Sequence, residues 1–251
     1  MKIATKIIIA CTVLCSLGVA VTGGLVGMKA SSLSEEALRN RAVSLLLSVR
    51  EIKKNEIERY FNSIHYQLET LTTDISTQDA MVAFTQGFNE YPTERVSDSD
   101  KQALSNYYRT QFGATYRDVN DGSSANEVGK YNQLSDKAKA MQARYIGINA
   151  NNLGEKHKLD ADSLNSSYDQ SHQRYHPPLR HFLESFGYYD IFLVDLQGNV
   201  VYSVYKELDY ATNLKTGPYA NTGIARVFNS VVGLSENEYR IEDFCTLLSI
   251  L

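Results

Sequence analysis

Cysteine is scarce in this chain and tryptophan is missing. The 251 residues include three cysteines, and the positions of Cys11, Cys15 and Cys245 leave residues 16–244 with none. A disulfide framework or a CxxC metal site is therefore excluded from that stretch. A cysteine-free domain is compatible with an oxidising compartment, although it does not require one.

Basic residues do not form a surface suited to nucleic acid. Lysine and arginine number 25 against 29 aspartates and glutamates, so the formal net charge is −4. Proteins that bind nucleic acid concentrate positive charge on one face or along one helix. We therefore expect no nucleic-acid partner.

Catalytic motifs are missing as well. Three aspartates, Asp190, Asp195 and Asp209, lie within or beside a predicted hairpin, and paired carboxylates can carry out acid–base chemistry. No nucleophile motif or phosphate-binding loop accompanies them. We predict that the chain is not an enzyme and that Asp195, shortly before Gly198, shapes a turn.

Histidine spacing gives only a weak indication of a metal site. His172 and His176 have the i, i+4 spacing with which two side chains can share a metal on one helix face. Pro177 and Pro178 separate them from His181, and no HExxH sequence is present. We predict no metal and no cofactor, and we interpret these histidines as polar residues at helix ends.

An uncharged apolar run near the amino terminus is the most informative feature that is present. Residues 7–28 carry no charged side chain, Lys2 and Lys6 precede them, and Lys29 follows. A helix needs about 20 such residues to cross a bilayer. We therefore interpret residues 1–29 as an N-terminal tail and a transmembrane helix.

Two other interpretations of this run remain open. A cleaved secretory signal has a shorter apolar region and a small-residue cleavage site, which Gly18-Val19-Ala20 resembles. A lipoprotein would use Cys11, but the apolar stretch before that cysteine is short. The length of the run favours an uncleaved anchor, with the short basic amino terminus in the cytoplasm. Residues from 30 onward would then be periplasmic, in a bacterial inner-membrane protein with a single N-terminal pass.

A helix of about 50 residues is predicted after the anchor. No proline or glycine occurs from Ser31 to about Phe84, and the acidic pair after Ser34 suits a helix start at that residue. Apolar residues recur at alternating steps of four and three: Ile57, Phe61, Ile64, Leu68, Leu71 and Ile75. One helix cannot bury such a heptad stripe alone, so we expect a homodimer or other helices of the chain to cover it.

Shorter helices are predicted in the middle of the chain. The apolar spacing indicates helices over residues 101–116, 131–150 and 162–175. Polar segments at 89–100 and 118–129 read as breaks between them. With the long helix, these segments make up a predicted helical sensor region over residues 30–175.

The last part of the chain predicts a small α/β module over residues 176–244. Its expected elements are, in order, a helix over 179–186 that ends at Gly187, strands over 191–196 and 200–205 around a turn, a helix over 219–232, and a strand over 239–244. Residues 245–251 form an atypical apolar tail that is too short to span a membrane. The predicted fold class is therefore α+β.

A ligand pocket is predicted in or beside this module. Arginine and tyrosine hydroxyls suit a small carboxylate ligand such as an amino acid or an organic acid. The candidate ligand-binding residues are Arg174, Tyr175, Tyr188, Tyr189, Tyr202, Lys206 and Tyr210.

Several segments of the module together resemble a known family. They are YHPP at 175–178, FL at 182–183, GYYDIFLVD at 187–195, GNVVYSV at 198–204 and GPY at 217–219. This pattern resembles the sensor regions of bacterial methyl-accepting chemotaxis proteins and related transmembrane receptors. The resemblance implies a PAS-like or Cache-like module, a small-molecule ligand, a dimeric receptor and a role in chemotaxis or signal transduction.

The chain departs from that family at its carboxyl end. Such receptors continue into a second membrane helix, a HAMP linker and a long cytoplasmic coiled coil, whereas this sequence ends at Leu251. We interpret the sequence as a sensor region truncated before these parts. The alternative function is a membrane-anchored periplasmic adaptor that binds a protein partner, and an enzyme with an unrecognised site is the third possibility.

Overall fold

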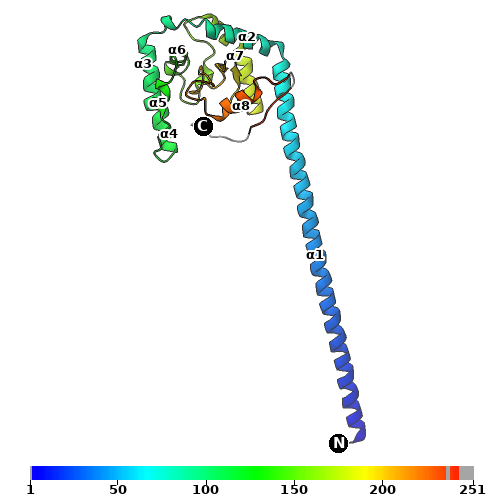
Figure 1. Ribbon diagram of the computed structural model, residues 1–251. Helices are drawn as coiled ribbons and strands as arrows, with labels where there is room; N and C mark the ends of the chain where they lie inside the picture. The colour runs from blue at the N-terminus through cyan, green and yellow to red at the C-terminus, as the bar shows by residue number, and fades with distance from the viewer. Residues whose placement is uncertain (1, 236–237, 243–251) are drawn as a thin grey trace. The chain divides into compact units, whose positions relative to one another are not determined.

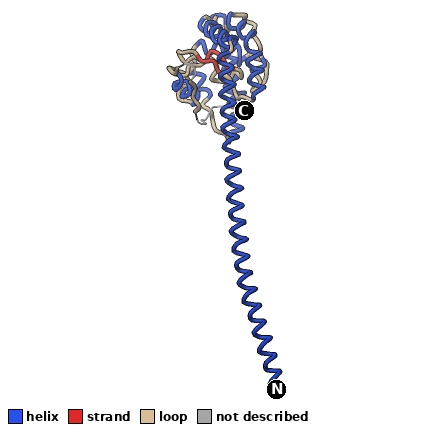
Figure 2. The backbone as a smooth tube through the Cα atoms, turned by 90° about the vertical axis from the view of Figure 1, so that its right-hand side faces the viewer, coloured by secondary structure: helices blue, strands red, loops and turns tan. Residues whose placement is uncertain are grey.

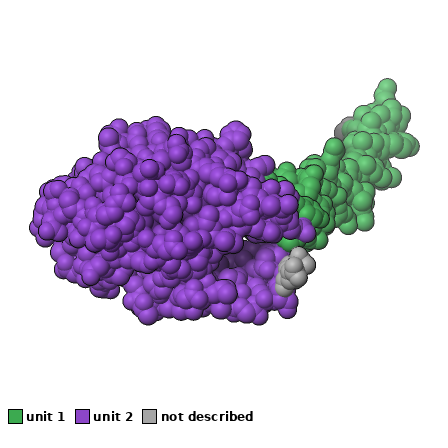
Figure 3. All heavy atoms as spheres, turned by 90° about the horizontal axis from the view of Figure 1, so that it is seen from above, with its two compact units in different colours: residues 1–68 green, residues 69–251 purple. Residues whose placement is uncertain are grey.

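The computed structural model describes residues 2–235 and 238–242. The chain divides into two compact units, Met1–Leu68 and Glu69–Leu251, which Figure 3 colours separately. The described part is mostly helical, with one two-stranded sheet. The predicted α+β class is thus confirmed in this coarse form.

One continuous helix, α1 (Ile3–Thr73), makes up the first unit and enters the second with its last turn. By length and composition it contains an apolar stretch able to cross a membrane. The predicted separate helix start at Ser34 is wrong, because the helix passes through that residue without interruption. None of its residues is fully buried: Ile57 and Phe61 of the apolar stripe are exposed, whereas Leu71 near the end of the helix is partly buried and packs against the core.

The long helix ends earlier than its composition predicts. Asp74 separates α1 from α2 (Ile75–Asn89), and its Oδ2 accepts a hydrogen bond from the backbone N–H of Thr77 at 3.0 Å. A short acidic side chain that caps a new helix in this way competes with continuation of the old one. The absence of proline and glycine was therefore not sufficient to predict an unbroken helix.

Short helical segments fill the middle of the second unit. They are η1 (Thr93–Arg95), α3 (Asp98–Tyr107), η2 (Tyr108–Phe112), α4 (Gly113–Val119), α5 (Glu127–Asn132), α6 (Asp136–Gln142), η3 (Ala143–Gly147) and η4 (Lys156–Lys158). The helix predicted over 131–150 is divided, because Ser135 caps α6 by accepting a hydrogen bond from the N–H of Ala138 at 3.1 Å.

A single helix, α7 (Ser167–Phe186), replaces the two helices predicted on either side of the proline pair. It begins with a capping box formed by Ser166 and Asp169 and ends at Gly187, whose φ of 69° lies in the left-handed region. Pro177 and Pro178 lie inside the helix. Their missing N–H groups free only carbonyls of exposed residues, which water can reach. The predicted domain boundary at residues 175/176 therefore falls within one helix.

The predicted hairpin is confirmed as an antiparallel pair, β1 (Phe192–Val194) and β2 (Val200–Ser203). The turn between them is shaped by Asp195, as predicted, because its carboxylate accepts hydrogen bonds from the backbone and side-chain N–H groups of Asn199, both at 2.8 Å. Figure 2 shows the two strands in red among helices and loops. Strand β2 is buried along its whole length, whereas β1 is half-buried.

The last helix, α8 (Gly223–Val231), begins four residues later than predicted. The strand predicted over 239–244 is not formed in residues 239–242, and the remainder of it, with the tail at 245–251, lies outside the described residues.

An aromatic core joins α2, α7 and β2 of the second unit. Helices α2 and α7 lie side by side (Figure 1), and a Cβ at Gly87 would approach the Cα of Tyr168 to 2.8 Å. Phe84 of α2 stacks on Tyr202 of β2 with ring centroids 4.5 Å apart. This close packing holds β2 against both helices and positions Lys206, which lies three residues after the end of the strand.

Candidate functional site

A fully buried lysine is the central feature of the site. Lys206 follows β2, is 2% exposed, and has a φ of 58°, in the left-handed region that non-glycine residues rarely adopt. Its Nζ lies over three tyrosine rings, at 4.3 Å from the centroid of Tyr202, 5.1 Å from Tyr210 and 5.8 Å from Tyr145. Such distances correspond to cation–π contacts. We call Tyr145, Tyr202 and Tyr210 the tyrosine cage.

The hydroxyl groups of the cage are all bound to partners away from the lysine. The Tyr145 hydroxyl donates to Asp169 Oδ1 at 2.7 Å, that of Tyr202 to His176 Nδ1 at 2.7 Å, and that of Tyr210 to the Tyr168 hydroxyl at 3.0 Å. Tyr168 in turn donates to the carbonyl of Val201 at 2.7 Å. These bonds fix the rings with their faces toward the lysine.

The positive charge of Lys206 is stabilised by carbonyl and ring contacts. Its Nζ donates a hydrogen bond to the carbonyl oxygen of Ser203 and forms no ion pair with a carboxylate of the described residues. Burial lowers the pKa of Lys206, and the negative charge of Asp190 acts in the opposite direction. Burial of an ammonium group that forms no ion pair within the described residues is costly in free energy, and groups perturbed in this way cluster at functional sites.

Asp190 is held by the loop ends around the hairpin. Its Oδ1 accepts hydrogen bonds from the backbone N–H groups of Ile191, Val204 and Tyr205, at 2.7, 2.9 and 3.2 Å. Its Oδ2 is buried and has no partner among the described residues. Burial raises the pKa of Asp190, and the three backbone bonds and Lys206 counteract this rise.

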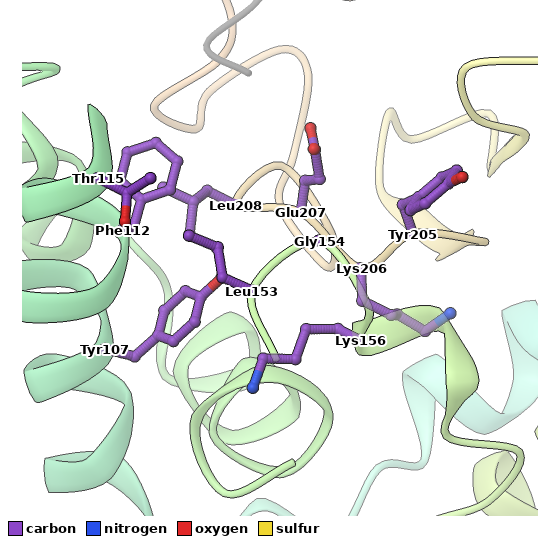
Figure 4. Close-up of a pocket in the computed structure, with 10 residues that line it drawn as sticks. All are labelled: Tyr107, Phe112, Thr115, Leu153, Gly154, Lys156, Tyr205, Lys206, Glu207 and Leu208. Atoms are coloured by element: carbon purple, nitrogen blue, oxygen red, sulfur yellow. The ribbon is translucent and has the colours of Figure 1, made fainter. Parts of the chain in front are cut away.

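A pocket with a volume of about 170 Å³ lies beside the lysine (Figure 4). Its lining residues are Tyr107, Phe112, Thr115, Leu153, Gly154, Lys156, Tyr205, Lys206, Glu207 and Leu208. Figure 4 shows the Lys206 side chain running away from Tyr107 and Phe112, with its nitrogen at the far end. The stem of Lys206 is therefore part of the pocket wall, while its ammonium group lies in the tyrosine cage.

Two further ionisable groups border the pocket. Lys156 Nζ donates to the carbonyls of Asn149 and Asn151, at 2.7 and 2.6 Å, and burial lowers its pKa. Burial raises the pKa of Glu207, an effect that is opposed by a hydrogen bond of 2.8 Å from the Tyr189 hydroxyl. The pocket therefore combines apolar walls with a cation and a carboxyl group.

Two histidines of α7 lie beside the cage and are fully buried, so their interpretation as polar helix-end residues is wrong. The rings of His172 and His176 stack at 4.2 Å. His176 Nε2 contacts the carbonyl of His157 at 2.6 Å, and His172 Nδ1 contacts that of Asp160 at 2.6 Å. Each of these nitrogens must carry a proton, because a carbonyl oxygen only accepts hydrogen bonds.

Burial lowers the pKa of both histidines, to about 2 for His176. They are therefore neutral in the folded protein near neutral pH. No group of histidine, cysteine and acidic side chains that could hold a metal ion is found within residues 2–235 and 238–242.

The His172→Phe substitution is expected to change how stability depends on pH. Below about pH 6.5 the unfolded chain binds a proton at His172 that the folded chain does not bind, so the folded state loses stability as the pH falls. The variant lacks this loss. The difference in free energy of unfolding between the variant and the wild type should therefore increase in favour of the variant, by at most about 1.4 kcal/mol for each pH unit below pH 6.5.

Urea denaturation of both proteins between pH 7 and pH 5 measures this difference. Groups that titrate equally in the two proteins cancel in the comparison. His181→Phe, at an exposed position of the same helix, is the matched control and should follow the wild-type profile. A constant difference between His172→Phe and the wild type over this range would show that His172 titrates equally in the folded and unfolded chains.

Three of the seven predicted ligand-binding residues come together in the structure. Tyr202, Lys206 and Tyr210 meet at the tyrosine cage. Tyr175 is buried instead against Phe84, with ring centroids 6.2 Å apart. Arg174 is exposed, and its guanidinium lies 5.1 Å from the centroid of the Tyr175 ring.

The remaining two tyrosines lie away from the cage. Tyr188 stacks on Phe182 with ring centroids 5.9 Å apart, and the Tyr189 hydroxyl donates a hydrogen bond to Glu207 of the pocket lining. Sequence reasoning missed Tyr145 and Lys156, because neither forms a local motif with the hairpin. The only sequence signal for Tyr145 was its place in the apolar stripe of the helix predicted over residues 131–150. Such a stripe predicts that the side chain is buried, but it does not predict contact with Lys206.

Comparison of the chain with protein-family models, with curated proteins and with solved structures finds no match in any of the three.

Proposed function

We propose that this chain is the ligand-sensing region of a membrane-anchored receptor, with no catalytic activity of its own. The observation that carries the proposal is the pocket of the second unit, one wall of which is the stem of a buried lysine. The pocket has mostly apolar walls with two ionisable groups, Lys156 and Glu207, at its border, and small-molecule sites are typically concave and mostly apolar with a few polar groups. Under this proposal the unit from Glu69 onward is a variant of the PAS-like or Cache-like sensors that the sequence resembles.

The pocket suits a small ligand with an apolar part and a polar end. Its volume of about 170 Å³ is below the ≈ 300–1,000 Å³ of pockets for drug-sized molecules. Lys156 supplies a cation, and Tyr107 and Phe112 supply aromatic surface. We propose an amino acid or a small organic acid as the ligand class.

Signalling would follow from unequal binding to two conformations. A ligand that binds one conformation more tightly shifts the population toward it. Helix α1 is continuous from its apolar segment to Thr73, so it provides a covalent connection between the anchor and the sensing unit. We propose a single pass through the bacterial inner membrane, a periplasmic sensing unit and a homodimer formed along the exposed α1 stripe, with chemotaxis or another signal response as the output.

The exposed stripe on α1 is also compatible with a second candidate function, a periplasmic adaptor. The stripe on α1 includes Ile57 at 56% and Phe61 at 42% exposure. A protein partner could cover it as well as a second copy of the chain could. In this alternative the pocket binds no small molecule.

A thermal-shift screen of the full chain in detergent micelles tests the proposed function. Near-ultraviolet circular dichroism is a suitable signal, because the chain has 17 tyrosines and no tryptophan. We expect one class among amino acids, organic acids, amines and sugars to stabilise the folded state, by about 2.7 kcal/mol when its concentration is 100-fold above Kd.

The Arg174→Ala variant is the control for this screen. Arg174 is exposed and lies outside the pocket, so the same ligands should give the same shifts. Loss of the shift in this variant would place the binding site elsewhere. No shift with any compound, in a protein that melts cooperatively, would favour the adaptor.

A further inference from the structure

The tyrosine cage has the construction of a cation-binding site. Three aromatic faces surround one ammonium group at 4.3–5.8 Å, and all three rings are completely buried. Aromatic cages of this kind recognise alkylammonium ligands, because the negative face of each ring attracts the cation. Here the cation is a side chain of the protein itself.

The cage does not depend on the lysine for its shape. Each hydroxyl is held from outside, through Asp169, His176 and Tyr168. Phe84 also supports the ring of Tyr202 by stacking at 4.5 Å. The rings are thus preorganised, and a preorganised site loses little free energy in ordering when a ligand binds.

The lysine, in contrast, is held at a cost. Its backbone has a φ of 58°, and the Nζ donates to a carbonyl oxygen, that of Ser203. A left-handed backbone at a non-glycine residue is maintained only when surrounding interactions favour it. An apolar side chain of similar length would avoid the desolvation of the charge, yet the position carries lysine.

We propose that the tyrosine cage is a binding site for a primary alkylammonium group, of which the Lys206 side chain is the resident occupant. The ammonium of an external amine or amino acid can take the same place when the lysine side chain is absent or has moved aside. The Lys206 side chain lines the pocket and places its Nζ over the cage rings, so displacement of this side chain would open a route from the pocket to the cage. The path of an external ion through the pocket is the only part of this proposal that rests on the proposed function.

The chemistry of the site defines the probe. Replacing Lys206 by alanine removes three methylene groups and the ammonium, which together correspond to n-propylammonium. This ion can donate to the Ser203 carbonyl and lie over the three rings, as Lys206 Nζ does. The neutral molecule n-propanol has the same length and can donate the same hydrogen bond, but it carries no charge.

The experiment uses the full chain in detergent micelles and near-ultraviolet melting curves. Lys206→Ala should be stabilised saturably by n-propylammonium chloride, with half-saturation at a concentration about tenfold lower than for n-propanol. Sodium chloride of equal concentration controls for ionic strength. Lys206→Met, which fills the space of the stem, and the wild type should show no saturable response to either compound.

Several outcomes would overturn the inference. Equal responses to the amine and the alcohol would mean that the substitution leaves an ordinary cavity. No response of a folded Lys206→Ala protein would mean that the cage does not bind ammonium groups. If this variant does not fold alone, it is refolded with each compound, and recovery with the amine but not the alcohol supports the proposal, whereas any other pattern contradicts it.

This test is independent of the ligand screen. The screen uses the wild type, in which Lys206 occupies the cage, and it reports on the pocket. A failed screen with a successful amine rescue would remove the sensor proposal and keep the cage. The reverse pattern would keep the sensor proposal and remove the cage.

Discussion

Replacing Phe84 by alanine is expected to reduce the free energy of unfolding of the second unit by about 3–5 kcal/mol. Phe84 is completely buried and stacks on Tyr202 at 4.5 Å. It also contacts Tyr168, His172 and Tyr175, with ring centroids 5.3–6.2 Å away. The substitution therefore opens a cavity where α2, α7 and β2 meet. Since natural domains are stable by only about 5–15 kcal/mol, much of the folded population would be lost.

Urea denaturation followed by near-ultraviolet circular dichroism measures this loss. Val82→Ala, at a 68% exposed position of the same helix, is the matched control and should change stability by less than about 0.5 kcal/mol. A loss below about 1 kcal/mol for Phe84→Ala would show that the three elements do not share one core.

Tyr202→Leu is expected to be the second most damaging substitution, with a loss of about 3–5 kcal/mol. The variant loses the stacking on Phe84, the ring closest to Lys206 Nζ and the hydrogen bond to His176 Nδ1. Aromatic pairs contribute about 0.5–1.5 kcal/mol each, and a desolvated cation–π contact about 2 kcal/mol. The remaining loss comes from the acceptor that is left buried without a donor.

Tyr202→Phe separates the ring from its hydroxyl. It keeps the stacking and the cage face, so its loss should be limited to about 1–3 kcal/mol for the unpaired His176 nitrogen. The same denaturation measurement applies to both variants. Equal losses for Tyr202→Leu and Tyr202→Phe would mean that the hydroxyl alone matters and that the ring contributes nothing to holding Lys206.

The features that could be predicted from the sequence are those with a local cause. The apolar run at residues 7–28 predicts a membrane-length helix, and such a helix is present within α1. Two apolar runs on either side of Gln197-Gly198-Asn199 predict the hairpin, and Gly187 predicts a helix end. In each case a few neighbouring residues determine the backbone conformation.

Errors arose where side-chain capping or packing outweighed composition. Asp74 ends α1 without any proline or glycine, because its carboxylate caps the next helix. Pro177 and Pro178 are accommodated in α7, because the carbonyls that they leave free are at exposed residues, while His172 and His176 hold the buried face. Amino-acid composition alone does not show which side chain caps a helix or which carbonyl groups are exposed to water.

The site was predictable only in part for a related reason. Tyr202, Lys206 and Tyr210 are close in the chain, so the hairpin itself suggests that they converge. Tyr145 and Lys156 reach the site from η3 and η4, through contacts between segments that are distant in the sequence. Arg174 was expected to bind a carboxylate, but the orientation of α7 leaves it exposed. Register and helix orientation depend on the whole core and cannot be derived from the hairpin.

The most direct test of the sensor proposal compares the wild type with Thr115→Trp in the same ligand screen. Thr115 is a half-buried residue of the pocket lining, and an indole at this position would occupy much of its volume of about 170 Å³. We predict that every ligand that raises the melting temperature of the wild type has no effect on a folded Thr115→Trp protein. A shift that survives in the variant, or a wild type that responds to no compound, would contradict the proposal.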